Sequence, residues 1–112
     1  MGLNKNSTRY YSNIQEKHVA KVLNGKQNVN SGATKWIKGD CSVQDILIEC
    51  KTVMTPKNSY TVKKDVLSKL KQETYMMGKQ HCALSFNFEP NGECFYVLSE
   101  KFFKELLDTY LP

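Results

Sequence analysis

The chain has 112 residues, enough for one hydrophobic core and too few for two, so we expect a single domain. With 40% apolar and 24% charged residues it has the composition of a folded protein, and no run approaches the roughly 18 apolar residues of a membrane helix. The net charge of +5 favours an anionic partner, and the polar start MGLNKNSTRYY lacks the apolar segment of a secretion signal, which favours the cytoplasm.

The first predicted element is a helix over about residues 13–24. Ser12 followed three residues later by Gln15 matches the capping-box pattern, and apolar residues then recur at helical spacing until Gly25. Residues 1–11, which precede this helix, are predicted to form a polar N-terminal arm.

Three strands are predicted before the next helix. Residues 26–34 are rich in polar residues and favour a loop, after which KWI (35–37) is expected to form a short strand. The β-branched run DILIECKT (45–52) is apolar on both faces, which is typical of a strand in the middle of a sheet. SYTV (59–62) is the third expected strand.

The C-terminal half predicts a helix, a hairpin and a second helix. Apolar residues at helical spacing indicate a helix over about 64–77. Two apolar stretches, 81–88 and 94–99, flank the turn-rich EPNGE and predict a β-hairpin, after which Ser99 is placed to cap a last amphipathic helix. The order α, β, β, β, α, β, β, α predicts one α/β domain with a mixed sheet.

The central strand carries charged residues whose spacing points to a site. Because side chains alternate along a strand, Glu49 and Lys51 lie on one face as neighbours. Asp45 is on that face too, but four residues away at roughly 3.3 Å per residue, about 13 Å, it is too far to share a metal ion. A bend at 41–44 would return the chain antiparallel and place Asp40 beside Glu49.

An aspartate, a glutamate and a lysine in one place suit metal-assisted hydrolysis of a phosphodiester. The carboxylates hold a magnesium ion, and the lysine orients a water molecule or offsets charge in the transition state. The structural alternative is a buried ion pair between Glu49 and Lys51, with Asp40 capping a turn.

Positive charge follows this strand closely. Residues 51–79 contain seven lysines and two acidic residues, and phosphate groups are natural partners for such a segment. The alternative is that these lysines form the solvated face of a helix.

At these residues the chain resembles the PD-(D/E)XK nuclease superfamily, and within it the Holliday-junction resolvase-like branch of archaea and phages. The resemblance covers about residues 13–88. It rests on Glu16 in the first helix, Ser31 and Gly32 in the loop, KGD ending at Asp40, and then LIECKT. The lysine-rich helix and the strand ALSFNF follow in the order of that branch.

The resemblance implies a nuclease domain over residues 12–112, with a restriction-endonuclease-like αβββαβ core, helices flanking the mixed sheet, and an extra C-terminal strand and helix. The catalytic and metal-binding residues that it implies are Glu16, Asp40, Glu49 and Lys51, with the main-chain carbonyl of Cys50 as a further metal ligand.

The implied activity is a Mg²⁺-dependent DNA endonuclease, with Mn²⁺ as a possible substitute, that resolves four-way junctions in a phage or mobile element. The alternatives are a nuclease of the same fold acting on duplex, flap or nicked DNA, and a non-catalytic DNA-binding module. No organic cofactor or membrane is expected. A homodimer is expected because two symmetric cuts need two sites, and Phe102 and Phe103 are candidates for either the core or the dimer face. The expected DNA contacts are Ser31, Lys38, Lys57, Ser59, Lys63 and Lys64.

Overall fold

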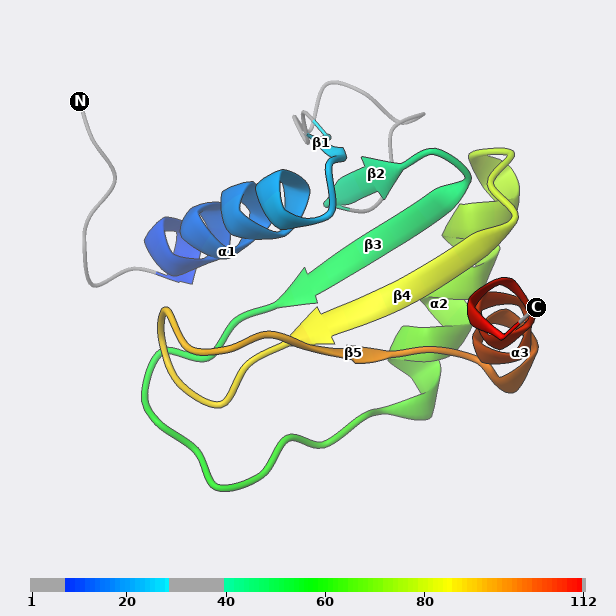
Figure 1. Ribbon diagram of the computed structural model, residues 1–112. Helices are drawn as coiled ribbons and strands as arrows, with labels where there is room; N and C mark the ends of the chain where they lie inside the picture. The colour runs from blue at the N-terminus through cyan, green and yellow to red at the C-terminus, as the bar shows by residue number, and fades with distance from the viewer. Residues whose placement is uncertain (1–7, 29–39, 112) are drawn as a thin grey trace.

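The strand predicted to be central lies in the middle of a five-stranded sheet (Figure 1). The computed structural model describes residues 8–28 and 40–111, and within them the strand order is β1-β2-β3-β4-β5. The elements in chain order are α1 Thr8–Val22, β1 Lys26–Gln27, β2 Cys41–Val43, β3 Ile46–Lys51, α2 Lys64–Met76, β4 His81–Phe86, β5 Phe95–Val97 and α3 Glu100–Tyr110. The chain is therefore a single α/β domain, as predicted.

Helices α1 and α2 cover opposite faces of this sheet because β3 is apolar on both sides. Val19 of α1 packs against Ile48 in one buried cluster, and Leu70 of α2 packs against Leu47 in the other. Ile48 and Leu47 are neighbours in the strand, so their side chains must point to opposite faces. The predicted alternation along the central strand is confirmed.

The sheet is mixed. β3 and β4 run parallel, with Leu47 opposite Cys82, and all the other neighbouring strands pair antiparallel. A parallel pair needs a long crossover, and α2 provides it between β3 and β4. The expected helix over 64–77 and the expected closing hairpin are both confirmed, with Leu84 of β4 opposite Val97 of β5.

The first helix begins earlier than predicted. It starts at Thr8, so residues 8–11 belong to α1 and not to an arm. At its other end Asn24 adopts a left-handed φ of 57°, and the Gly25 N–H donates to the Ala20 carbonyl at 2.8 Å. This is the hydrogen bond of a Schellman motif. A side chain at Gly25 would collide with the Ser42 carbonyl of β2, so close packing explains the glycine.

Two short strands form where the sequence predicted a loop and a bend. β1 and β2 pair antiparallel, and β2 turns into β3 at Gln44, whose φ is 50°. The expected strand at 59–62 is wrong: this segment forms no strand, and Tyr60 instead packs against the buried cluster on the α2 side of the sheet, where it stacks on Phe86 with ring centroids 4.5 Å apart. The expected strand at 35–37 lies outside the described residues. The predicted order of elements is found, but two of the first three strands are different ones.

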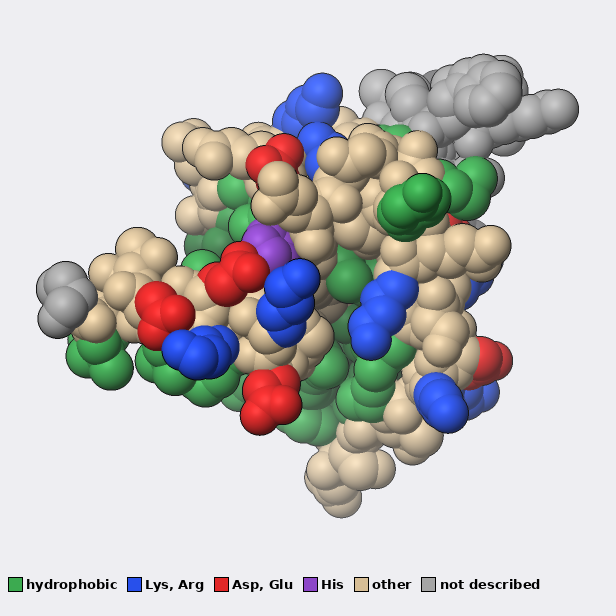
Figure 2. Space-filling view, turned by 90° about the vertical axis from the view of Figure 1, so that its right-hand side faces the viewer, with side chains coloured by type: hydrophobic (Ala, Val, Ile, Leu, Met, Phe, Trp, Pro, Cys, Tyr) green, Lys and Arg blue, Asp and Glu red, His purple; other side chains and the backbone are tan. Residues whose placement is uncertain are grey.

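The last helix is capped as predicted. The Ser99 hydroxyl accepts a hydrogen bond from the Phe102 N–H at 3.1 Å. Phe102 is buried and stacks on His81, with ring centroids 4.3 Å apart. The next apolar residues on α3 are exposed, and Figure 2 shows green side chains along the lower edge of this helix, below its charged residues. They are Phe103, Leu106, Leu107 and Tyr110.

No helix in the described ranges combines the length and the apolar content that crossing a bilayer requires.

Candidate nuclease site

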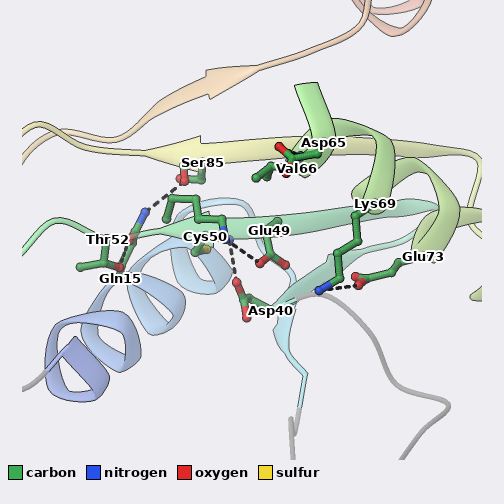
Figure 3. Close-up of polar contacts among 11 residues, drawn as sticks. Gln15, Asp40, Glu49, Cys50, Thr52, Asp65, Val66, Lys69, Glu73 and Ser85 are labelled. Carbon is green, nitrogen blue, oxygen red and sulfur yellow. Dashed lines mark hydrogen bonds and ion pairs between the residues drawn. The ribbon is translucent and has the colours of Figure 1, made fainter. Parts of the chain in front are cut away.

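Asp40 directly precedes β2, at the point where the antiparallel register carries it to the side of Glu49. Cys41 lies opposite Ile48, which places Asp40 opposite Glu49. Its main-chain N–H donates to the Ile48 carbonyl at 2.9 Å, and its carboxylate Oδ2 accepts a hydrogen bond from the Cys50 N–H at 2.7 Å. Figure 3 shows the two carboxyl groups below β3. The predicted placement of Asp40 beside Glu49 is confirmed.

Glu49 and Lys51 project from β3 on the face that α2 covers, because they alternate with Ile48 and Cys50. The Lys51 Nζ lies 3.6 Å from a Glu49 carboxylate oxygen, and 39% of the lysine and 25% of the glutamate side chain are exposed. The amine therefore contacts the site while remaining partly open to solvent. Asp45, which spacing excluded, precedes β3 at its other end and is exposed.

Burial raises the pKa of the carboxyl groups in this site, so they ionise less readily than in water. Desolvation and then the nearby charge of Asp40 raise the pKa of Glu49 to about 7, while Lys51 opposes the shift. Desolvation also raises the pKa of Asp40, against the hydrogen bond from the Cys50 N–H and the charge of Lys51. A bound cation would offset the repulsion between these two partly buried carboxylates, so the arrangement favours cation binding.

Glu73 of α2 is an acidic neighbour that our sequence analysis did not select. Only 17% of its side chain is exposed, and its carboxylate lies 3.9 Å from the Lys69 amine of the same helix. Its charge contributes to raising the pKa of both Asp40 and Glu49. Figure 3 shows Lys69 and Glu73 on the side of α2 that faces the site. The sequence feature that could have identified Glu73 is its position three residues after Leu70, on the side of the helix that packs against the sheet.

Glu16 lies on α1, which covers the opposite face of the sheet. Its carboxylate accepts a hydrogen bond from the Gln27 amide at 3.0 Å, and its main-chain carbonyl accepts one from the Cys41 thiol at 3.3 Å. Desolvation raises the pKa of Glu16, and the charge of Asp40 contributes to the rise. The Glu16 carboxylate is therefore coupled electrostatically to Asp40, but it is already hydrogen-bonded to Gln27. Arg9 of the same helix is another residue that our sequence analysis did not select. Its charge lowers the pKa of both Glu16 and Asp40.

The carboxylate oxygens of Asp40 and Glu49 meet part of what a magnesium ion requires of its ligands. Among the described residues no three aspartate, glutamate, histidine or cysteine side chains gather closely enough to hold a metal. Mg²⁺ is usually bound by one or two carboxylates and keeps several of its waters. Asp40 and Glu49 provide two carboxylates that repel each other and are partly removed from solvent. They match that need without a third acidic side chain.

The expected DNA contacts fall into two groups. Lys57, Ser59, Lys63 and Lys64 are exposed and belong to the segment between β3 and α2 or to the start of that helix. The Lys57 main-chain N–H donates to the Phe88 carbonyl at 2.7 Å, which ties this segment to the end of β4. Ser31 and Lys38 lie outside the described residues.

No family model, curated protein or solved structure matches this chain. Its function must therefore be inferred from the residues of the site and their geometry.

Proposed function

We propose that the protein is a Mg²⁺-dependent DNA endonuclease that cuts four-way junctions. The observation that carries this proposal is the meeting of Asp40, Glu49 and Lys51 at the adjoining ends of β2 and β3. An isolated salt bridge needs only one carboxylate, whereas here the charge of a second one, Asp40, adds to the desolvation that raises the pKa of Glu49. That arrangement is costly without a cation and typical of functional sites.

Each residue of the site has a distinct part in the proposed hydrolysis. Asp40 and Glu49, with the main-chain carbonyl of Cys50, would hold the ion, and the Cys50 N–H keeps the Asp40 carboxylate in place. A bound magnesium ion polarises a phosphate ester and acidifies water. Lys51 positions the attacking water through its amine and offsets charge that develops on the phosphate. Glu16 and Ser31 are proposed to support the ion and the phosphate respectively.

The decisive experiment is cleavage of a labelled four-way junction at pH 8, above the pKa of about 7 of Glu49. With Mg²⁺ or Mn²⁺ the native chain should cut paired arms. Glu49→Gln should lower the rate by about 10³-fold or more, because it removes a metal ligand. Glu93→Gln, which changes an exposed glutamate in the turn before β5, is the matched control and should cut normally. Equal cutting of linear duplex would contradict the junction as substrate and leave a duplex nuclease.

A non-catalytic DNA-binding module is the second candidate, and one observation favours it. The Glu16 carboxylate is hydrogen-bonded to Gln27, so the third acidic group is not turned wholly toward Asp40. Calorimetry distinguishes the two candidates. A nuclease should bind Mg²⁺ or Mn²⁺ with heat that disappears in Asp40→Asn and Glu49→Gln, whereas a module without metal chemistry should show no such heat.

A further inference from the structure

A recess between α2 and α3 lies at the end of the sheet opposite the proposed metal site. Its wall includes His81, which begins β4 opposite Ile46, whereas Lys51 is the last residue of β3. Its volume is about 360 Å³, which falls within the roughly 300–1,000 Å³ of small-molecule sites. A ligand bound here would be separate from the proposed metal site.

Three lysines from three different segments line this recess. Lys71 belongs to α2, Lys79 to the turn before β4, and Lys101 to the first turn of α3. No aspartate or glutamate of the described ranges lines it. Figure 2 looks onto this end of the molecule, where blue side chains flank a narrow area of green. The wall therefore carries three positive charges that no acidic residue of the same wall offsets.

Ion pairing on the two helices leaves the lysines of the recess available. Lys69 of α2 and Lys104 of α3 each lie near an acidic residue one turn further along their helix, at 3.9 Å and 3.2 Å. Lys71 and Lys101 stand on the same two helices and have no ion-pair partner within the part of the chain that the structure describes. An anion from outside the chain would be their counter-charge.

Two contacts hold the wall of the recess in place. The Lys79 amine donates to the Gln44 main-chain carbonyl at 2.7 Å, which uses one of its three N–H groups and leaves the others for a ligand. The His81 Nε2 lies 2.7 Å from a carboxylate oxygen of Glu105, and the His81 ring stacks on Phe102. The Glu105 carboxylate is therefore engaged by the imidazole and not by a lysine of the recess.

The rim of the recess carries an aromatic ring. Tyr75 stands one helical turn after Lys71 and is 85% exposed. Within the described ranges no other ring packs against it. An exposed ring of this kind can stack on a planar base. The recess thus combines positive charge in its wall with an aromatic surface at its edge.

We propose that this recess binds a small molecule with two or more linked phosphate groups, such as a nucleoside diphosphate or triphosphate. Lysine binds phosphate as a point charge, and a single phosphate group carries about −1.5 to −2 at pH 7, so three lysines match two linked phosphates better than one. The inference goes beyond the proposed nuclease function and does not rest on it.

The first test uses the full chain without metal or DNA. The ¹⁵N-labelled protein is titrated with pyrophosphate, ADP and adenosine at constant ionic strength, and the main-chain amide signals of Lys79, Gln80 and Lys101 are followed by NMR. Pyrophosphate and ADP should shift these signals. Adenosine has no phosphate and should bind about tenfold more weakly or less. Signals that stay silent with pyrophosphate and ADP would overturn the inference.

A matched pair of double variants separates a site from general attraction to a basic surface. Replacing Lys71 and Lys101 by alanine should weaken pyrophosphate binding about tenfold or more. Replacing Lys69 and Lys104 by alanine removes the same charge from the same two helices and should leave the affinity within about twofold of the native value. Equal weakening by both double variants would overturn the inference.

Tyr75→Ala distinguishes the two sources of linked phosphates. If the ligand is a nucleotide, ADP should bind the native chain more tightly than pyrophosphate, and Tyr75→Ala should weaken ADP alone, by about tenfold. Equal binding of ADP and pyrophosphate, unchanged in Tyr75→Ala, would support the phosphate site and assign it to inorganic polyphosphate. A short DNA duplex that displaces pyrophosphate and shifts the same signals would overturn the inference and make the recess part of the DNA interface.

Discussion

At the scale of single residues, Glu49 links stability to the proposed chemistry. Its carboxyl group is held on β3 by the apolar neighbours that fold the chain, yet desolvation and Asp40 raise its pKa to about 7. In the unfolded chain the ordinary value is 4.5. Between these two values the folded protein keeps a proton that the unfolded chain releases. Stability is therefore lost as the pH rises from 4.5 through 7.

Replacing Glu49 should consequently stabilise the protein while removing its activity. At pH 8 Glu49→Gln should raise the free energy of unfolding by on the order of 1 to 3 kcal/mol, because the amide is never charged. At pH 4 the gain should be much smaller. Urea unfolding at both pH values measures the difference, with Glu93→Gln as the exposed control. A Glu49→Gln chain that is less stable than the native one at pH 8 would contradict the burial penalty.

At the scale of elements, capping residues help to determine where the helices begin. Ser99 was identified from sequence because a hydroxyl residue before an apolar helical stripe satisfies free N–H groups, and its hydroxyl does accept from the Phe102 N–H. The start of α1 was missed because Ser12 and Gln15 imitate a cap inside a longer helix. Gln15 instead reaches β4 through the Ser85 carbonyl, a contact 70 positions along the chain.

Removing the Ser99 cap should weaken α3 measurably. Ser99→Ala should lower the free energy of unfolding by about 1 kcal/mol, since the Phe102 N–H loses its acceptor. Ser68→Ala, at an exposed position inside α2, is the matched control and should not lower stability, because alanine is the better helix former. Urea unfolding of both variants gives the comparison, and equal stability of the two would rule out a capping role.

The start of α2 should contribute phosphate contacts. Lys63 and Lys64 are exposed there, and Lys63 stands at the N-cap in an extended conformation. Replacing both by alanine should weaken DNA binding similarly for all sequences. It should also flatten the salt dependence of log K by about 1 to 2, since each phosphate contact contributes roughly 0.9.

The matched control for this double variant changes Lys101 and Lys104, two exposed lysines at the start of α3. Affinities measured across a salt series should show the native slope for this control. An unchanged slope for the Lys63 and Lys64 variant would remove α2 from the DNA interface.

At the scale of the whole molecule, the exposed stripe of α3 is the surface best suited to a second copy. Phe103, Leu106, Leu107 and Tyr110 recur at the spacing of one helix face and are 53%, 44%, 37% and 81% exposed. A chain with one proposed site needs a partner to cut a junction twice, and a two-fold pair of α3 helices would cover this stripe in both copies.

Dimerisation through α3 is open to direct measurement. Analytical ultracentrifugation should find a dimer of the native chain and a monomer of Leu106→Asp, because the new charge would be buried at the interface. Lys101→Asp, on the opposite side of the same helix, should remain dimeric. Circular dichroism must show that both variants stay folded. A native chain that is monomeric at the concentrations at which it cuts DNA would contradict the model of paired sites.

The sequence by itself determined the features that depend on near neighbours. Alternation along β3 placed Glu49 and Lys51 on one face, helical spacing located α2, and the reach of a metal ion selected Asp40 over Asp45. Only the tertiary structure placed Glu73 beside this site, since the packing of α2 on β3 brings its carboxylate close. The short strands β1 and β2 are also set by distant contacts. Local patterns carry no information about such contacts, because their energies arise only when segments remote in the chain close on one another.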